Sequence, residues 1–198
     1  MKKISKMPAI LFAGGKSSRM GQDKALLPYG GFDSLAEFGY RNLCNIFEDV
    51  YISAKNDKFD FCPPLVFDKF EESSPLVGII SIFDELKCNE FFILSVDMPC
   101  VEKKDILKLL DFADHHKDCD AIIACSPNGI EPLFGIYRNS IYDTANSFLK
   151  ENNHKLTALI KQSKNKLFEF ENEDIFLNLN YPSDYEQAIK LFHTKRSI

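Results

Sequence analysis

The sequence contains no long apolar run. Its longest apolar stretches, such as Met7–Ala13 and Phe91–Val96, are far shorter than the roughly 20 residues that a membrane-spanning helix needs. An excess of positive charge is also absent, because 24 lysines and arginines stand against 29 aspartates and glutamates, which gives a net charge of −5. The composition therefore argues against a membrane protein and against a general nucleic-acid binder. An anionic ligand would have to meet a local basic cluster.

Sequence patterns of metal and redox sites are missing too. The six cysteines show neither zinc-type nor thioredoxin-type spacing, and the four histidines form no metal-binding pattern. A chain of 198 residues can bury a core without disulfides, so we expect reduced, mostly buried thiols. The basic start of the chain precedes an apolar stretch that is short and contains a proline, which argues against an export signal. A cytoplasmic protein is expected.

The length allows one compact domain, and no linker, low-complexity tract or internal repeat interrupts the chain. We therefore predict a single domain over residues 1–198 and expect a monomer. In this interpretation the first half handles a nucleotide and the second half handles an acceptor.

Short apolar runs alternate with longer segments in which apolar residues recur every three or four positions. Such short runs are typical of strands buried on both faces, and the longer segments are typical of helices. The expected strands are Pro8–Ala13, Val50–Ala54, Pro64–Phe67, Phe91–Val96, Ala121–Cys125, Pro132–Tyr137, Lys166–Phe170 and Ile175–Leu179. The expected helices are Ser34–Phe47, Pro75–Lys87, Lys103–His116, Ser140–Lys150, Lys155–Lys161 and a last one after Pro182, with capping boxes at Ser34–Glu37 and Ser183–Glu186. The pattern predicts an α/β fold with a mostly parallel central sheet and helices on both faces.

A glycine-rich segment with three basic residues follows the first expected strand. It extends from Phe12 to Lys24, at the edge of an α/β sheet where ligands bind. Gly14 and Gly15 allow a sharp turn, and the exposed N–H groups of such a turn can hold phosphate oxygens. The positive charges in this acidic protein come from Lys16, Arg19 and Lys24. The segment therefore predicts binding of an anion such as a nucleotide triphosphate.

Two common phosphate-binding motifs do not fit this segment. A P-loop would need glycine at position 10, which is isoleucine, although Gly15-Lys16-Ser17 matches its end. The dinucleotide fingerprint also fails, because its first glycine pair is missing.

The full string, Phe12-Ala-Gly-Gly-Lys-Ser-Ser-Arg-Met-Gly-Gln-Asp-Lys24, resembles the signature of the molybdenum cofactor guanylyltransferases, and only Phe12 departs from it. The resemblance continues from about residue 8 to residue 190, through the segments Ser74–Gly78, Asp97–Pro99 and Asn178–Pro182. It implies a Rossmann-like nucleotidyltransferase fold. It also implies transfer of GMP from GTP to the phosphate of molybdopterin or its molybdenum form, with Mg²⁺ as cofactor and pyrophosphate as the other product. Cofactor-biosynthesis proteins or chaperones of molybdenum enzymes would be its protein partners.

The resemblance also implies site residues. Those for GTP are Phe12, Ala13, Gly14, Gly15, Lys24, Ser53, Asp68 and Asp97. Those for catalysis are Arg19, Lys24 and Asp97, of which Asp97 is the metal ligand. The residues themselves favour these roles, because Asp97 directly follows an expected strand and Mg²⁺ needs only one or two carboxylates beside phosphate oxygens and water. Asp68 ends another strand in the same way.

Several positions depart from the family pattern. Ser53 stands where relatives have a base-contacting asparagine, Ser74 replaces a glycine, and Glu131 stands where relatives often have histidine. Asn178 and Asn180, which alternate in a segment expected to be extended, could hydrogen-bond the pterin or a phosphate of the acceptor. These differences bear on the choice of base and acceptor.

Two alternatives remain open. One is a related nucleotidylyltransferase that uses CTP or a different phosphorylated acceptor. Gly14 argues against CTP, because cytidylyltransferase relatives resemble Ala-Ala-Gly at this point, and the Gly-x-Gly-Thr-Arg loop of sugar-phosphate enzymes is absent. The other is a nucleotide-binding module without activity, which would be expected to have lost Asp97 or Lys24.

Overall fold

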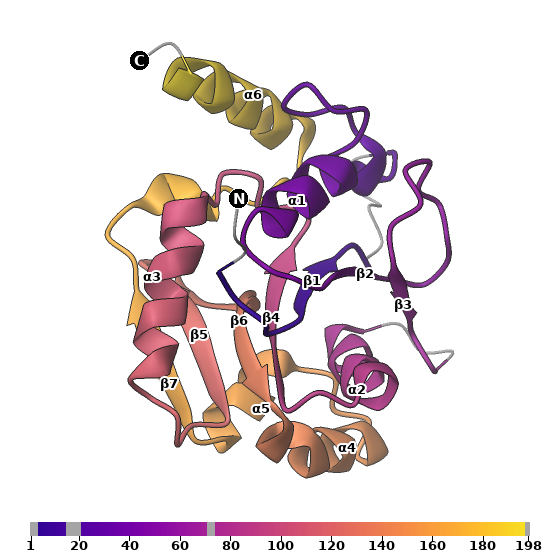
Figure 1. Ribbon diagram of the computed structural model, residues 1–198, viewed down its shortest axis with the longest axis vertical. Helices are drawn as coiled ribbons and strands as arrows, with labels where there is room; N and C mark the ends of the chain where they lie inside the picture. The colour runs from indigo at the N-terminus through magenta and orange to yellow at the C-terminus, as the bar shows by residue number, and fades with distance from the viewer. Residues whose placement is uncertain (1–3, 15–20, 71–73, 197–198) are drawn as a thin grey trace.

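The computed structural model describes residues 4–14, 21–70 and 74–196. Within these residues, seven strands form one sheet in the order β3-β2-β1-β4-β6-β5-β7 (Figure 1). The strands are β1 (Ala9–Phe12), β2 (Val50–Ala54), β3 (Leu65–Phe67), β4 (Glu90–Ser95), β5 (Ala121–Ser126), β6 (Gly129–Arg138) and β7 (Asn165–Glu169). Only β6 is antiparallel to its neighbours, so the expectation of a mostly parallel sheet is confirmed.

Helices cover both faces of this sheet, as expected. They are α1 (Leu35–Cys44), α2 (Pro75–Leu86), α3 (Lys103–Asp114), α4 (Tyr142–Lys150), α5 (Leu156–Gln162) and α6 (Pro182–Arg196). On one face the core joins the sheet to α1, α3 and α6, and on the other face it joins the sheet to α2, α4 and α5 (Figure 1). Strand β1 shows the reason, since its four buried residues alternate between the two cores: Ala9 and Leu11 face one, Ile10 and Phe12 the other. Continuous apolar runs in the sequence reflect this two-sided burial.

Of the two predicted helix starts, the one at Ser34 is confirmed and the one at Ser183 is wrong. Ser34 caps α1 as expected, because its Oγ accepts the Glu37 N–H at 3.1 Å. The prediction for the last helix is wrong: Pro182 is the first residue of α6 rather than the residue before it. The carboxylate of Asp184 accepts the N–H groups of Asn180 and Tyr181, at 2.9 and 2.8 Å, and so orders the chain that enters the helix.

The strand expected at Ile175–Leu179 does not form. A short 3-10 helix, η3 (Glu173–Phe176), takes up its first part. Ile175 and Leu179 are fully buried while Leu177 is only half-buried, so burial recurs every four residues instead of every second one. The segment packs on the face of the sheet instead of pairing at its edge.

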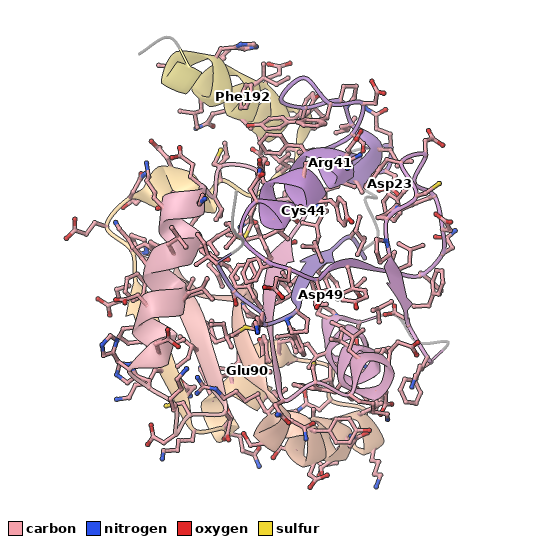
Figure 2. All side chains as sticks on the ribbon, viewed as in Figure 1. Asp23, Arg41, Cys44, Asp49, Glu90 and Phe192 are labelled. Carbon is pink, nitrogen blue, oxygen red and sulfur yellow. The ribbon has the colours of Figure 1, made fainter. Side chains whose placement is uncertain are left out.

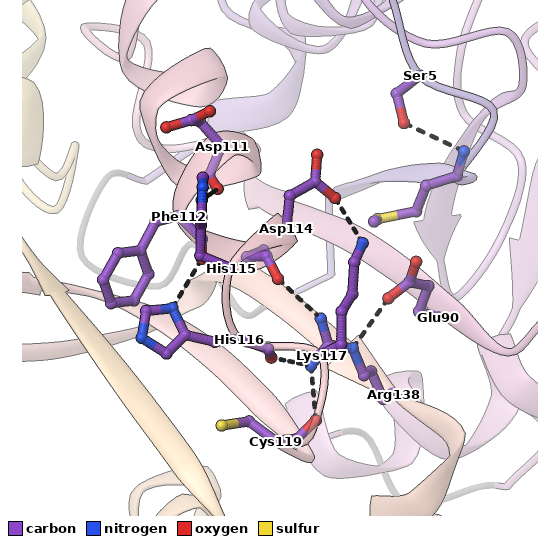
Figure 3. A network of polar contacts seen from close by, with 12 residues as sticks. Ser5, Glu90, Asp111, Phe112, Asp114, His115, His116, Lys117, Cys119 and Arg138 are labelled. Atoms are coloured by element: carbon purple, nitrogen blue, oxygen red, sulfur yellow. Dashed lines mark hydrogen bonds and ion pairs between the residues drawn. The ribbon is translucent and has the colours of Figure 1, made fainter.

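Arg138 closes the amino-terminal edge of the parallel strands. Its Nε donates to the Glu90 carboxylate at 2.9 Å, and its terminal nitrogens donate to the carbonyl oxygens of His116, Cys119 and Ala113 at 2.7, 2.8 and 3.3 Å (Figure 3). The guanidinium group thus joins the start of β4 to the end of β6 and to the turn after α3. Because the planar guanidinium presents five N–H donors in a fixed geometry, arginine suits such a multiple contact.

The cysteines take no part in crosslinks. All six lie in the described part of the chain and none forms a disulfide. The expectation that most of them are buried is wrong, because only Cys100 and Cys119 are buried and Cys62 is exposed. In the same described part, no helix combines the length and the hydrophobicity needed to cross a bilayer.

Candidate active site

The carboxyl ends of three parallel strands meet at one edge of the sheet. In register, Phe12 at the end of β1 pairs with Ser53 of β2 and with Ser95 of β4. Two hydrogen bonds extend this alignment past the strands, from Ala13 N to Ser53 O at 2.9 Å and from Val96 N to Phe12 O at 3.0 Å. The segments that follow these strands therefore start side by side, as ligand-binding segments of α/β sheets do.

Lys24 and Asp97 meet at this edge. Lys24 begins the short 3-10 helix η1 (Lys24–Leu26), and its Nζ donates to Asp97 Oδ2 at 2.7 Å and to Leu179 O at 3.0 Å. The backbone of Leu179 returns a hydrogen bond to Asp97 O at 3.0 Å. Two residues predicted for catalysis are thus in direct contact, although 73 positions separate them, and the segment before α6 completes the contact.

The carboxylate of Asp97 has the chemistry of a Mg²⁺ ligand. Its side chain is 20% exposed, so it is accessible to a cation. Among residues 4–14, 21–70 and 74–196, no three histidine, cysteine or acidic side chains form a group that could hold a metal. Mg²⁺ does not need such a cage when a nucleotide brings phosphate oxygens. The residues present therefore fit a metal that is bound together with a nucleotide.

Glu131 is a second carboxyl group beside Asp97, and the sequence marked it only as a departure from the family pattern. Its Oε1 accepts a hydrogen bond from Ser126 Oγ at 3.1 Å, and Asn178 also hydrogen-bonds it. Burial raises the pKa of Glu131, and the negative charge of Asp97 raises it further, against the lowering effect of these two hydrogen bonds. Only the tertiary fold reveals that this residue of β6 belongs to the site.

The phenyl ring of Phe12 lies between two glycines. A Cβ on Gly14 would lie 3.2 Å from Phe12 Cε1, and a Cβ on Gly78 would overlap the other edge of the ring. The family signature has leucine at this position, and the two glycines leave room for the larger phenylalanine. Ser53 lies next to Gly78 and is buried, with 1% of its surface exposed. Its predicted contact with a base stays a prediction, and so do the roles of Phe12, Ala13 and Gly14.

Asp68 directly follows β3, at the same edge of the sheet. Burial raises the pKa of its carboxyl group, and the positive charge of Lys55 opposes this shift. Phe67 and Phe70 on either side of it are exposed apolar side chains. A half-buried carboxylate can accept hydrogen bonds from the N–H donors of a nucleotide base, and the role of Asp68 stays a prediction.

Asn178 and Asn180 lie on a turn rather than on an extended segment. The Asn180 N–H donates to the Asn178 carbonyl at 3.0 Å, which is the hydrogen bond of a γ-turn. The amide of Asn178 contacts Glu131, whereas Asn180 is exposed. The turn brings them to the edge where Asp97 and Lys24 meet, but not onto one face of a strand. Gly15 and Arg19, also predicted for the site, lie outside the described residues.

Two further contacts could not be found from the sequence. Lys58, in the segment after β2, contacts Asp23 at 2.5 Å and the Ala13 carbonyl at 3.4 Å. Ser74 caps α2 by accepting the Val77 N–H, and its hydroxyl lies 2.9 Å from Nδ1 of His154. The serine that replaces a family glycine therefore ties the start of α2 to the segment before α5.

Comparison with known proteins identifies the family of this chain. Residues 9–167 match the model of the MobA-like NTP transferase domain. A molybdenum cofactor guanylyltransferase of Campylobacter jejuni is 41% identical over 187 residues, which cover 93% of this chain and 96% of that protein. A probable molybdenum cofactor guanylyltransferase of Carboxydothermus hydrogenoformans is 34% identical, over 97% of this chain and all of that protein.

A solved structure shares the fold. The molybdopterin-guanine dinucleotide biosynthesis protein A of Archaeoglobus fulgidus superposes with a TM-score of 0.80 over 95% of this chain and 100% of its own, at 19% identity. This likeness confirms the Rossmann-like nucleotidyltransferase fold that the signature implied. With the family match over most of the chain and relatives above 30% identity, the chain belongs to the molybdenum cofactor guanylyltransferases of the MobA-like NTP transferase family.

Proposed function

We propose that this protein transfers GMP from GTP to the terminal phosphate of molybdopterin or its molybdenum form, and that it does so with Mg²⁺. The observation that carries the proposal is the contact between Lys24 and Asp97 at the carboxyl edge of the sheet. It joins the end of the glycine-rich signature to the acidic residue that follows β4. The relatives named molybdenum cofactor guanylyltransferase support the choice of GTP and of the acceptor.

The reaction exchanges one phosphoanhydride bond for another. An oxygen of the acceptor phosphate attacks the α-phosphorus of GTP, a new P–O–P bond forms, and the bond to the β-phosphate breaks to release pyrophosphate. The attacking phosphate has its second pKa near 6, so most of it is already doubly ionised at neutral pH and needs no general base. The enzyme must therefore orient two anions and stabilise the charge that builds up on the leaving group.

Lys24 suits the second task. Its ammonium group is held by Asp97 and by the Leu179 carbonyl, so its position is set before the substrate arrives. A lysine side chain is a compact charge on a flexible stem and can exchange one anionic partner for another. When Mg²⁺ is bound with the nucleotide, it would be held by Asp97 and would supply positive charge to the phosphate oxygens.

The structure brings two polar residues, Glu131 and Asn178, together on the side of the site that we assign to the acceptor. The two side chains are hydrogen-bonded, and the negative charge of Asp97 acts on the carboxyl group of Glu131. A carboxylate can accept hydrogen bonds from the N–H groups of a pterin edge. We assign Asn178, Asn180 and Glu131 to the acceptor. Protein partners, a monomeric state and a cytoplasmic location stay predictions.

Pyrophosphate release tests the proposal. The protein is incubated with Mg²⁺, molybdopterin and each of the four nucleoside triphosphates in turn, with parallel reactions in EDTA and without the acceptor. We expect release with GTP only, and only when both the metal and the acceptor are present. Equal turnover with CTP and GTP would overturn the choice of base, and turnover in EDTA would overturn the metal requirement. No turnover with any of the four would overturn the activity.

A further inference from the structure

Lys58 reaches both sides of the glycine-rich segment. Its Nζ lies 2.5 Å from Asp23 Oδ2 and donates to Ala13 O at 3.4 Å. Ala13 directly follows β1, and Asp23 directly precedes η1. One ammonium group therefore joins the two points of the chain between which the segment 14–22 lies.

Asp23 connects Lys58 to the start of η1, where Lys24 lies. Its Oδ1 accepts the Ala25 N–H at 3.0 Å and so caps η1, while its other oxygen receives Lys58. The first residue of η1 is Lys24, whose Nζ lies 2.7 Å from Asp97. The cap at Asp23 holds the backbone at the start of η1, from which the side chain of Lys24 extends to Asp97.

An ordinary ion pair on the surface contributes little to stability and would have no such effect. The pair of Lys58 and Asp23 differs from that kind of pair in burial. The two side chains are 20% and 35% exposed, whereas in the surface pair of Lys164 and Asp118 they are 63% and 73% exposed. Like the pair of Lys164 and Asp118, it joins residues far apart in the chain, and here the two residues lie on either side of the site: Asp23 directly before Lys24 and Lys58 in contact with Ala13.

We propose that Lys58 is a positioning residue of the active site: through Asp23 and Ala13 it holds the ends of the glycine-rich segment together and aims Lys24 at the triphosphate. The family signature includes Asp23 and Lys24 but not Lys58, so the structure assigns this role to a residue outside the signature. The inference rests on the proposed function, because the triphosphate is the ligand that this arrangement would receive.

A double-mutant cycle tests the inference. The variants are Lys58→Gln, Asp23→Asn and the combination of both. Asparagine caps a helix as well as aspartate does, so Asp23→Asn removes the charge that faces Lys58 and keeps the cap on η1. Two quantities are measured: kcat and KM for GTP from pyrophosphate release, and the Kd for GTP from calorimetry without the acceptor.

We expect each single variant to lower kcat/KM for GTP by about tenfold and to raise the Kd for GTP, and the double variant to be no worse than either single, because all three break the same contact. Lys58→Arg keeps the charge and the donors and should return kcat/KM to within roughly threefold of the unmodified protein. Glu90→Gln is the matched control, since it replaces a carboxylate by an amide in the partly buried pair with Arg138 at the other end of the sheet. It should leave both the Kd and kcat/KM unchanged.

Several results would overturn the inference. Unchanged kinetics and Kd in Lys58→Gln would show that the contact positions nothing. Effects that multiply in the double variant would show that Lys58 acts on the nucleotide directly and not through Asp23. An equal loss in Glu90→Gln would reduce the effect to general stability.

The binding measurement separates the two proposals. An unmodified protein that binds GTP but releases no pyrophosphate would overturn the proposed function, while the Kd series would still decide the role of Lys58. An unmodified protein that binds no GTP would overturn both.

Discussion

Strand β4 has an acidic residue at each end, and the two make different kinds of ion pair. At its first residue, Glu90 pairs with Arg138, and two residues past its last, Asp97 pairs with Lys24. The cations are similarly buried, with 11% of the Arg138 side chain and 17% of the Lys24 side chain exposed. Burial alone therefore does not tell a structural pair from a functional one.

The difference lies in the cation and in its neighbours. Arg138 also donates to three backbone carbonyls (Figure 3). Because these acceptors belong to the backbone, the planar guanidinium group is held in one position. Among the hydrogen bonds described above, Lys24 donates to one carboxylate, that of Asp97, and to one carbonyl, that of Leu179, and a second carboxyl group, Glu131, lies near Asp97. Figure 2 shows the two ends in one view, with Asp23 near the functional edge and Glu90 at the opposite one. An ion pair at the carboxyl edge can thus exchange partners with a substrate, whereas the pair at the amino edge holds the fold.

The strongest test of this comparison is Asp97→Asn. Asparagine keeps the shape and one oxygen but loses the negative charge that a hard cation needs, so we expect turnover to fall by at least about 10², as when one preorganised charge-stabilising group is removed. Steady-state kinetics over a range of Mg²⁺ concentrations, with circular dichroism as a check on folding, would measure it. Near-normal turnover at low Mg²⁺ would mean that another group holds the metal.

Arg138→Met should have the opposite profile. It removes a donor from Glu90 and from three carbonyls, of which that of Ala113 keeps the N–H of His116. We expect a loss of about 2 kcal/mol of stability, which lowers the melting temperature by about 4–8 °C in a chain of this size. Among protein that remains folded, kcat/KM for GTP should stay within about twofold of normal, because this end of the sheet is remote from the substrate. Calorimetric melting and kinetics on one preparation would check both. A large loss of kcat/KM below the melting range would contradict the division between the two ends.

The smallest expected effect is that of Glu131→Gln. Burial and Asp97 raise the pKa of Glu131 in the folded state, so ionising it costs stability once the pH is above that raised pKa, and costs nothing below its ordinary pKa. Glutamine is neutral at every pH and can keep contacts with Ser126 and Asn178. The variant should therefore be slightly more stable at pH 7.5, by less than about 1 kcal/mol because the group is partly exposed, and equal near pH 4.

Melting curves at the two pH values decide the matter. Glu90→Gln serves as the contrast, since its carboxylate has a cation and its replacement should destabilise at pH 7.5. Destabilisation by Glu131→Gln at pH 7.5 would show that the carboxylate has a compensating partner in the fold.

Much of the fold was predictable from local patterns. The strands β1 to β7 lie within about three residues of their expected positions. In central strands such as β1 and β4, two-sided burial leaves a continuous apolar run in the sequence. The failure at Ile175–Leu179 has a physical cause. An apolar segment can bury its side chains without pairing as a strand, and this segment buries Ile175 and Leu179 against the face of the sheet.

The signature from Phe12 to Lys24, the position of Asp97 after a strand and the alternation of strands and helices were determined by the sequence by itself, since each depends on residues close together in the chain. Only the tertiary structure decided that Lys58 joins Asp23 to Ala13, that Glu131 lies beside Asp97 and that Arg138 closes the other end of the sheet. These contacts link residues that are tens of positions apart, and a long flexible side chain carries no local pattern that reveals its partner. The fold alone sets such distances, through the order in which the strands pair.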